Sequence, residues 1–272
     1  MSKHSKWIHL WYAPRGAVSA CLRPVAMVFG WVVWLRRLLF RMKLLPSETM
    51  DVPVIVVGNI TAGGTGKTPI VGEIARRLSE RGWSPGIISR GYGGSSESWP
   101  QMVRPDSNPN EVGDEPLLLA QSLSIPVAVA PRRVEAARAA IFKGGANILV
   151  SDDGLSHYAL NRTLEVAIID AARGLGNELL LPAGPLREPA SRLDAVDLVL
   201  QHGGGASQPS FVLVPTELRS LDGEGASLTT LQGLRVDAIA GIGNPRRFFE
   251  SLTALGAEVI EHAFDDHHRF EQ

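Results

Sequence analysis

The segment GNITAGGTGKT, residues 58–68, carries the clearest chemical signal in the sequence. Glycine-rich backbone can close its N–H groups around phosphate oxygens, and a helix that follows adds its N-terminal dipole. We expect Lys67 at the β- and γ-phosphates of a nucleotide and the Thr68 hydroxyl on Mg²⁺. The strict motif has Gly where Thr61 stands, and neighbouring glycines supply the backbone freedom. The expected nucleotide-binding residues of the loop are Thr61, Ala62, Gly63, Gly64, Thr65, Gly66, Lys67 and Thr68.

Two aspartates, Asp152 and Asp153, follow the short apolar segment 148–151 and precede a glycine. Phosphoryl transfer needs a carboxylate near Mg²⁺, usually at the end of a buried strand. Alone, an Asp-Gly pair is typical of a turn that reverses the chain. Beside a phosphate loop, we expect Asp152 to face the metal, directly or through water, with Asp153 next to it.

Two further acidic segments leave alternatives open. Asp114, in the segment VGDEP, either caps a helix or faces the active site, and the residues alone favour the cap. Near the end of the chain, the segment FDDHHRF places Asp266 beside His267. Two adjacent histidines with two aspartates are compatible with a metal site, a catalytic acid–base pair or a polar tail.

The elements that must position these residues alternate between strands and helices. The β-branched run 52–57 predicts a buried strand before the loop, and apolar residues at helical spacing predict a helix after it, ended by Gly82. The alternation predicts an α/β fold, a P-loop NTPase-like and mostly parallel sheet with flanking helices. Further strands are expected at 86–89, 126–130, 148–151, 166–170 and 197–200, helices at 117–123 and 134–142, and a loop at 95–110.

The net charge of −1 hides a separation of charge along the chain. Residues 1–50 carry eight Lys and Arg and a single acid, whereas 51–272 carry 19 basic and 27 acidic side chains. The first 34 residues also hold four of the six tryptophans. The uncharged run 24–35 is too short to cross a bilayer, and Arg23 and Pro24 are expected to interrupt the longer apolar stretch 17–35.

Cationic flanks, tryptophans and a short apolar run predict a helix that lies in, or dips into, an anionic leaflet. A helix packed on the body of the protein is the alternative. A cleaved signal peptide fits less well because the apolar run begins late, and nucleic acid fits less well because basic and apolar residues are interleaved. The single Cys21 excludes a disulfide framework and is compatible with a reducing compartment.

The composition shifts after residue 202, where three consecutive glycines begin. Strands are expected at 211–214, at 236–240 and near Val259, with a helix at 246–255 that the segment GIGNP opens. The sequence thus predicts a membrane-association segment at 1–46, a phosphate-loop domain at 47–202, which the resemblance described next implies to be a kinase domain, and a smaller C-terminal α/β domain at 203–272.

Seven segments together resemble the tetraacyldisaccharide 4′-kinase (lipid A 4′-kinase) family of Gram-negative bacteria. The resemblance implies an alcohol-acceptor phosphotransferase that uses ATP and Mg²⁺ to phosphorylate the 4′-hydroxyl of a tetraacylated glucosamine disaccharide 1-phosphate in lipid A biosynthesis. It implies a peripheral or monotopic protein at the cytoplasmic face of the inner membrane, with the anionic surface bound through 1–46. Neither nucleic acid nor an obligate protein partner is expected. The segments are VGNITAGGTGKTP (57–69), SRGYGG (89–94), GDEP (113–116), SDDG (151–154), LPAGPLREP (181–189), GIGNPRRFF (241–249) and FDDHHRF (264–270).

The resemblance also assigns roles to individual residues. Asp114 is expected to pair with His267, beside Asp266, as the group that accepts the proton of the sugar hydroxyl. Arg187 is expected near the nucleotide phosphates. Glu188 is expected near Mg²⁺, which would add it to the metal-site residues Thr68 and Asp152.

Three departures from the family pattern bear on this assignment. Leu155-Ser156-His157 stand where the family usually has an aromatic residue and Gln-His, and Thr163 stands where it commonly has an acid. Family members also continue well beyond the DHH segment, so the chain is expected to be a natural short form or a truncated one. The alternatives to a lipid kinase are a nucleotide-dependent switch or assembly factor and a degenerate paralogue that binds without transfer.

Overall fold

The computed structural model describes residues 7, 10–205, 208–220, 223–264 and 268. The chain divides into two compact units. The larger unit comprises residues 8–62 and 66–211, and the smaller comprises 212–272 with the short stretches 1–7 and 63–65. Residues 203–211, which the sequence analysis grouped with the C-terminal domain, therefore cluster with the larger unit.

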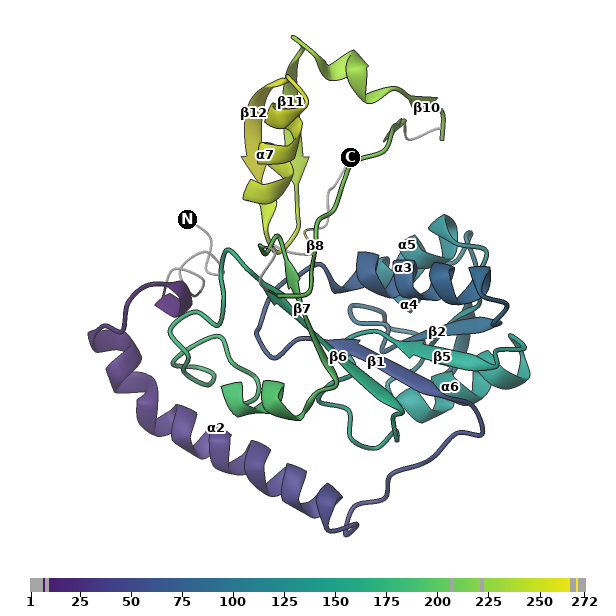
Figure 1. Cartoon of the computed structure of the whole chain (residues 1–272), viewed down its shortest axis with the longest axis vertical. Helices are drawn as coiled ribbons and strands as arrows, with labels where there is room; N and C mark the ends of the chain where they lie inside the picture. The colour runs from purple at the N-terminus through teal and green to yellow at the C-terminus, as the bar shows by residue number, and fades with distance from the viewer. Residues whose placement is uncertain (1–6, 8–9, 206–207, 221–222, 265–267, 269–272) are drawn as a thin grey trace. The chain divides into compact units, whose positions relative to one another are not determined.

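An eight-stranded sheet forms the centre of the larger unit (Figure 1). Its strand order is β3-β4-β2-β5-β1-β6-β7-β8, and every neighbouring pair is parallel except β3 with β4. The predicted fold class, a mostly parallel α/β sheet, is thus confirmed. The strands are β1 (Val54–Gly58), β2 (Pro85–Ser89), β3 (Gln101–Val103), β4 (Val127–Val129), β5 (Ile148–Ser151), β6 (Leu164–Asp170), β7 (Leu198–His202) and β8 (Ser210–Phe211).

Helices cover both faces of this sheet, which explains why its central strands lack a polar face. Val56 of β1 packs in one apolar cluster with α6 (Arg133–Phe142), whereas its neighbour Val57 packs in another with α3 (Lys67–Glu80) and α5 (Asp114–Ser122). Figure 1 shows α3 and α5 on one face and α6 on the other. Because β1 and β5 are parallel neighbours, the loops that follow them share the carboxyl edge of the sheet, the edge where ligands bind in such folds.

The helices begin and end close to the predicted positions. α3 starts at Lys67, holds Pro69 in its first turn and stops at Glu80, shortly before Gly82 (φ 86). The loop expected at 95–110 is partly wrong, because it contains β3 and the start of α4 (Pro109–Val112). Asn108 caps α4 by accepting the N–H of Asn110 at 3.0 Å, so one of the asparagines that suggested a loop in fact starts a helix.

The N-terminal apolar region forms one continuous helix, α2 (Ala17–Arg41), so Arg23 and Pro24, which interrupt the apolar run in the sequence, do not interrupt the helix. Proline removes one backbone N–H and leaves the carbonyl of Ala20 without that helical bond. Pro24 and Ala20 are both exposed, so the carbonyl is not trapped in the core. By length and composition alone α2 could cross a membrane, with a mean hydropathy of 1.7 over an 18-residue window.

The smaller unit is built on a parallel pair of strands, β11 (Arg235–Ala240) and β12 (Glu258–Ala263). α7 (Pro245–Ala254) connects them, and its Phe249 packs into a small apolar core. These elements match the predicted strands and helix of this region. The strand expected at 211–214 is wrong in its extent, because β8 ends at Phe211 and the next three residues form no strand.

Four short elements complete the described parts of the smaller and the larger unit. β9 and β10 form an antiparallel pair, and a 3₁₀ turn follows them. A second 3₁₀ segment, η1, connects β6 to β7 and follows the segment LPAGPLREP. Their bounds are β9 (Leu218–Arg219), β10 (Gly225–Ala226), η2 (Leu228–Leu231) and η1 (Ala190–Ala195).

Candidate active site

The loop between β1 and α3 is held by the segment LPAGPLREP. The N–H of Ala62 donates to the carbonyl of Pro185 at 2.7 Å, and the N–H of Arg187 donates to the carbonyl of Ile60 at 2.7 Å. Thr61 forms an antiparallel bridge with the same segment. Two regions far apart in sequence are therefore fixed to each other by backbone hydrogen bonds, which places Arg187 beside the loop.

The conformation of the loop depends on glycine where it enters α3. Gly63 and Gly66 have positive φ angles of 102° and 84°, and Gly66 is the N-cap of α3. Gly64 and Thr65 lie between them in irregular backbone. A Cβ atom on Gly66 would lie 2.7 Å from Nδ1 of His202, so no larger residue fits at this position without movement of the ring.

His202 is a residue of this region that the sequence analysis used only as a boundary. It is the last residue of β7, is 4% exposed, and stacks on Phe211 with ring centroids 4.7 Å apart. Its side chain packs against the backbone of Gly66 and so supports the end of the loop. Its position at the carboxyl end of an expected parallel strand was the signal that could have placed it there.

Lys67, Asp153 and Arg187 converge from three different segments. Lys67 Nζ donates to Oδ1 of Asn59 at 3.2 Å and lies 3.7 Å from Oδ1 of Asp153. Arg187 Nη1 lies 3.0 Å from Oδ2 of the same carboxylate. Burial would raise the pKa of Asp153, but the two cations outweigh it and hold the pKa below its ordinary value. Two positive charges are thus positioned side by side, as the binding of a polyphosphate requires.

Asp152 has a different environment from its neighbour Asp153. It is 1% exposed, and its Oδ1 atom has no hydrogen-bond partner among the residues that the structure describes. Burial raises its pKa to about 7; the charges of Glu115 and Asp153 act in the same direction, whereas Lys67 and Arg133 oppose them. A buried carboxyl group with a raised pKa and an unsatisfied oxygen is typical of a functional site.

A buried guanidinium fixes the backbone of the two aspartates. Arg133 Nη2 donates to the carbonyl oxygens of Asp152 at 2.9 Å and of Asp153 at 3.0 Å. The sequence analysis did not single out Arg133. An arginine at the start of a predicted helix is normally solvated, and nothing in its local sequence showed that it would be buried.

Thr68 and Asp152 fit a Mg²⁺ ion that is bound together with phosphates. Mg²⁺ in such sites takes one or two protein oxygens and completes its shell with phosphate oxygens and water. In the described part of the chain, no group of three or more His, Cys, Asp and Glu could hold a metal by itself. Thr68 lies in the first turn of α3 and is buried. The unsatisfied Oδ1 of Asp152 is the protein atom that such an ion would satisfy.

The segments SRGYGG and GDEP pack against each other, and glycines permit their close approach. A Cβ atom on Gly94 would lie 2.2 Å from the carbonyl oxygen of Glu111, and one on Gly113 would lie 2.5 Å from that of Tyr92. The N–H of Ser95 also donates to a carbonyl in this region at 2.8 Å. The first of these segments therefore fixes the turn that begins α5.

Asp114 lies at the start of α5 but does not cap it. Gly113, with a φ angle of 89°, occupies the N-cap, and Asp114 is the first helical residue. The expectation that Asp114 caps the helix is therefore wrong. The neighbouring Glu115 lies close enough to Asp152 to raise the pKa of that carboxyl group. The start of α5 thus belongs to the same electrostatic environment as the aspartate pair.

Glu188 is turned toward a different set of partners. It is 2% exposed; Ser156 Oγ donates to its Oε1 at 2.7 Å, and Tyr158 Oη donates to its Oε2 at 2.6 Å. Arg192 Nε lies 3.4 Å from Oε2, and Arg37 of α2 lies 4.0 Å away. Both carboxylate oxygens are therefore satisfied by groups outside the cluster of Lys67, Asp153 and Arg187.

The positions that depart from the family pattern have structural roles in this chain. Leu155 is fully buried against Gly58, where a Cβ atom would lie 2.8 Å from its Cγ. Ser156 binds Glu188, and Thr163 Oγ1 accepts the N–H of Val54 at 3.1 Å. The remaining predicted catalytic residues, Asp266 and His267, lie outside the described residues, and their pairing with Asp114 stays a prediction.

Comparison with known proteins gives a consistent result. The family model described as tetraacyldisaccharide-1-P 4′-kinase (LpxK) matches residues 18–272. A tetraacyldisaccharide 4′-kinase of Alkalilimnicola ehrlichii is 52% identical over 92% of this chain and 76% of its own length. That of Methylobacillus flagellatus is 47% identical over 98% and 81%. A crystal structure of LpxK from Aquifex aeolicus in complex with ATP superposes with a TM-score of 0.77 at 28% identity, over 92% of this chain and 83% of that one. The chain therefore belongs to the tetraacyldisaccharide 4′-kinase family, whose members are phosphotransferases with an alcohol acceptor.

Proposed function

We propose that the cluster at the carboxyl edge of the sheet transfers the γ-phosphoryl group of ATP, with Mg²⁺, to the 4′-hydroxyl of a tetraacylated glucosamine disaccharide 1-phosphate. The observation that carries this assignment is the buried, unsatisfied carboxyl of Asp152 beside Lys67 at the start of α3. The ATP complex of the Aquifex aeolicus relative supports ATP as the donor.

In this proposal Lys67 and Arg187 bind the phosphates, and Asp153 keeps the two cations in place. A phosphoryl group that passes through a loose transition state is stabilised mainly by fixed positive charge, which these side chains supply. Mg²⁺, when bound, neutralises charge on the phosphate oxygens next to Thr68 and Asp152. Arg133 keeps the aspartate pair in position through its backbone bonds.

The acceptor hydroxyl needs a group that takes its proton. In the reaction the hydroxyl oxygen forms a bond to the γ-phosphorus, the bond to the β–γ bridging oxygen breaks, and ADP leaves. We assign the proton to the pair of Asp114 and His267, with Asp266 beside them, as the family resemblance implies. The start of α5 near Asp152 supports the part of this assignment that concerns Asp114.

The contacts of Glu188 favour an organising role over metal binding. Its oxygens accept from Ser156 and Tyr158 and face Arg192, so little capacity remains for an ion. The segment that carries Glu188 also carries Arg187. Glu188 then fixes this segment to η1, while Arg187 reaches the phosphates.

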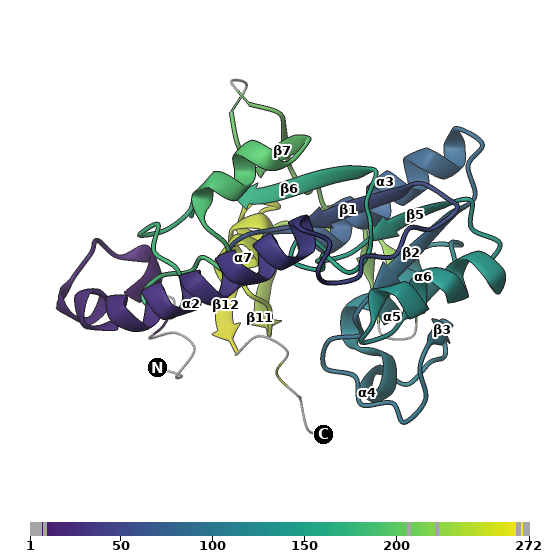
Figure 2. The same ribbon diagram turned by 90° about the horizontal axis from the view of Figure 1, so that it is seen from below.

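The anchoring of α2 supports contact with one membrane surface. In the segment that precedes α2, Trp11 Nε1 donates to the carbonyl of Pro182 at 3.0 Å. At the C-terminal end of α2, Phe40 packs on Tyr158 with ring centroids 5.8 Å apart. α2 lies alongside the larger unit, as Figures 1 and 2 show, and this arrangement favours contact with one membrane surface over a helix that crosses the bilayer.

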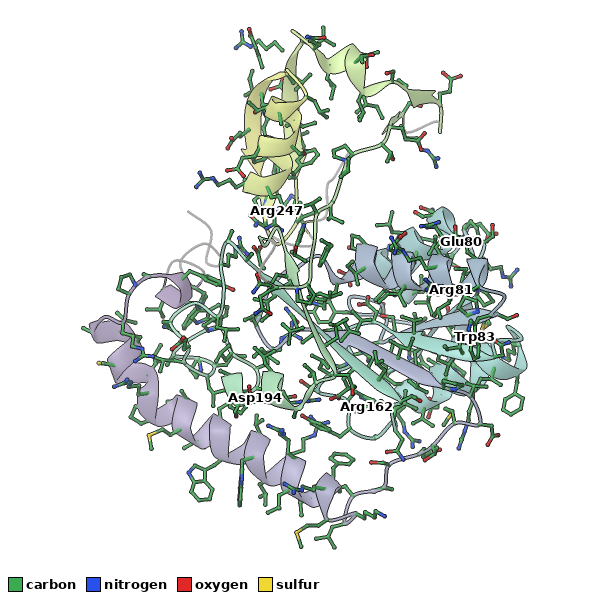
Figure 3. All side chains as sticks on the ribbon, viewed as in Figure 1. Glu80, Arg81, Trp83, Arg162, Asp194 and Arg247 are labelled. Atoms are coloured by element: carbon green, nitrogen blue, oxygen red, sulfur yellow. The ribbon has the colours of Figure 1, made fainter. Side chains whose placement is uncertain are left out.

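The outward side of α2 supplies the apolar surface for this contact. Its exposed valines follow helical spacing and share one face, and Figure 3 shows side chains that project from the helix away from the sheet. With the basic residues of the arm, this face suits the anionic inner membrane, and the use of ATP as donor supports the cytoplasmic side. The valines are Val18, Val25, Val28 and Val32.

Transfer of ³²P from labelled ATP to a lipid A disaccharide 1-phosphate in neutral detergent tests the proposed reaction. The full chain should transfer label, Lys67→Ala should abolish it, and the exposed control Lys143→Ala should retain it. ATP binding without transfer by the unmodified chain would indicate the degenerate paralogue, and the kinase assignment of this chain would be wrong.

A further inference from the structure

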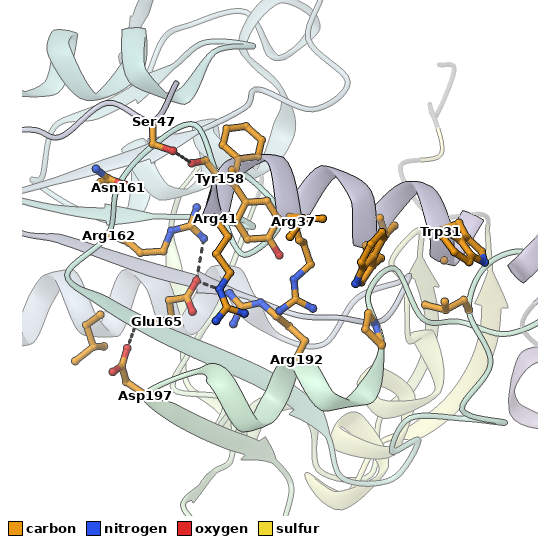
Figure 4. A pocket seen from close by; sticks show the side chains of 18 of the residues that line it. Trp31, Arg37, Arg41, Ser47, Tyr158, Asn161, Arg162, Glu165, Arg192 and Asp197 are labelled. Atoms are coloured by element: carbon orange, nitrogen blue, oxygen red, sulfur yellow. Dashed lines mark hydrogen bonds and ion pairs between the residues drawn. The ribbon is translucent and has the colours of Figure 1, made fainter. Parts of the chain in front are cut away.

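We propose that a second site, beneath α2 and at the opposite edge of the sheet, binds the headgroup of an anionic glycerophospholipid. A cavity of about 1150 Å³ lies between the inner side of α2 and the larger unit (Figure 4). Its floor includes Leu164, where β6 begins, and Asp197, which precedes β7. The parallel strands run from this edge to the carboxyl edge that carries the phosphate loop.

The cavity has an apolar end and a cationic end. Residues of α2 at helical spacing line it, and their character changes along the helix from apolar to basic. Figure 4 shows Trp31 near the middle of α2, with Arg37 and Arg41 nearer to its C-terminal end. Such a gradient matches a molecule with hydrocarbon chains and an anionic head. The apolar end includes Met27, Trp31, Trp34 and Leu180, and the cationic end includes Arg37, Arg41, Arg162 and Arg192.

The two acidic side chains at the cationic end differ in their partners. Glu165 contacts Arg162 at 2.8 Å and also Arg192, so it is paired within the wall of the cavity. Asp197 accepts the backbone N–H of Glu165 at 2.7 Å, a hydrogen bond from a neutral donor that fixes this carboxylate beside β7.

Two arginines of α2 remain to bind an anion. Arg37 lies 4.0 Å from Glu188, a distance at the limit of an ion pair, and its side chain is 31% exposed. Arg41 is exposed and, among the described residues, has no carboxylate within 4.0 Å. Ser47 and Asn161 line the same end, where Ser47 Oγ donates to the carbonyl of Tyr158 and Asn161 Nδ2 donates to Thr49 Oγ1, each at 2.7 Å. Paired guanidinium groups are a usual means of holding a phosphate.

The tryptophans and the membrane contact identify the source of the phosphate. Trp31 is 67% exposed and packs edge-on against Trp34, with ring centroids 5.6 Å apart, at the apolar end. Tryptophan at the boundary of a lipid is typical of the interfacial region of a bilayer. Because this inference rests on the proposed membrane contact of α2, the phosphate that reaches the cavity most readily is that of a bilayer phospholipid.

The bound lipid is distinct from the molecule that is phosphorylated. β6 has seven residues, and the two edges of the sheet are therefore about 20 Å apart. The reacting hydroxyl must reach Lys67 at the carboxyl edge, whereas Arg162 and Asp197 of the cavity lie at the opposite edge, and its Arg37 and Arg192 contact Glu188 between the two. The phospholipid would thus hold α2 to the membrane and leave the catalytic edge free for its substrate.

Native mass spectrometry of the full chain tests this site. The protein is incubated with phosphatidylglycerol or phosphatidylcholine and is then released from neutral detergent in the spectrometer. The unmodified chain should retain one phosphatidylglycerol and bind phosphatidylcholine at least tenfold more weakly. Arg41→Gln should reduce retention about tenfold, and the double variant with Arg37→Gln further. The matched control is Arg23→Gln, which removes the same charge from an exposed position of the same helix outside the cavity.

Equal retention by the Arg41 and Arg23 variants would overturn the proposal, as would equal binding of the two phospholipids. Displacement of phosphatidylglycerol by stoichiometric lipid A disaccharide 1-phosphate would also overturn it, because the cavity would then be part of the substrate site. The proposed reaction is checked separately in the same detergent. Arg41→Gln should transfer phosphate at the unmodified rate there, so loss of lipid binding and loss of catalysis remain distinguishable.

Discussion

Asp152 and Glu188 are both buried carboxylates that the sequence assigned to the same metal ion, and the structure gives them opposite surroundings. Glu188 accepts from two hydroxyl groups and contacts an arginine, whereas Oδ1 of Asp152 has no hydrogen-bond partner in the part of the chain that is described. An acidic residue near a phosphate loop is therefore a candidate ligand only while its oxygens are unsatisfied. The two carboxylates are distinguished by the groups that bind their oxygens, and residue type alone does not reveal those groups.

The largest expected effect is on catalysis at the unsatisfied member of this pair. Asp152→Asn should lower kcat about 10³-fold, because the amide cannot supply the anionic oxygen that Mg²⁺ requires. The transfer assay measures this directly. Glu188→Gln is the matched control, and it should stay within tenfold of the unmodified chain. If the two variants lost similar activity and both lost their response to Mg²⁺, the distinction between the two carboxylates would be wrong.

The stability of the same variant should change in the opposite direction. The pKa of Asp152 in the fold is about 7, against an ordinary value of 3.8, so its ionisation destabilises the folded state as the pH rises through this interval. Asn removes that penalty. Without Mg²⁺, Asp152→Asn should match the unmodified chain near pH 4 and exceed its free energy of unfolding by up to about 4 kcal/mol at pH 8.

Urea unfolding at several pH values between 4 and 8 tests this expectation, with Asp106→Asn, at an exposed position, as the control. A difference that did not grow with pH would contradict the assigned pKa. In the unmodified chain, Mg²⁺ and nucleotide should bind more tightly as the pH rises toward 7, because the metal competes with a proton for Asp152.

Truncation of the satisfied carboxylate should affect folding more than chemistry. Glu188→Ala leaves the buried Arg192 without one of its carboxylate partners and is expected to lower the free energy of unfolding by about 3 kcal/mol. Glu188→Gln retains an acceptor for Ser156 or Tyr158 and should cost less. Thermal and urea unfolding of both variants measures the effect on stability. The concentration of Mg²⁺ that gives half-maximal activity is the second measurement. A shift in that concentration with unchanged stability would indicate that Glu188 is a metal ligand.

The smallest expected effect concerns Arg187, the neighbour of Glu188 in sequence. It contacts Asp153 at a half-exposed position, so Arg187→Ala should lower kcat/KM for ATP about tenfold and leave stability nearly unchanged. Arg187→Lys should recover part of the loss, because the charge returns without the planar guanidinium. Arg104→Ala, at an exposed position, is the control. An equal loss in that control would exclude a specific role.

The sequence predicted the elements whose signals are local and strong. The β-branched run before the phosphate loop and the apolar spacing after it correspond to β1 and α3. Local rules of helix capping and helix breaking did not hold at two positions. Gly113 takes the N-cap that Asp114 was expected to fill. Pro24 lies within α2, where the carbonyl of Ala20 that it leaves unbonded is at the surface. Both outcomes depend on backbone geometry and exposure, which a single residue type does not determine.

The candidate site was only partly accessible to sequence reasoning for a similar reason. Motifs identified Lys67, Asp152 and Arg187, and the fold brings Lys67 and Arg187 together at Asp153, beside Asp152. His202 and Arg133 could not be found in this way, because their roles arise from packing between segments far apart in the chain.

The attachment of α2 and of the segment before it to the larger unit has a kinetic consequence. On the proposed membrane contact, the enzyme and its acceptor lipid share one surface and meet by lateral diffusion in two dimensions. The relevant acceptor concentration is then a mole fraction in the bilayer or micelle, and dilution with neutral detergent at constant bulk concentration should slow turnover. Because Trp11, in the segment before α2, and Phe40, near the end of the helix, contact the larger unit, the orientation of the catalytic edge to that surface is set by the fold instead of by a flexible tether.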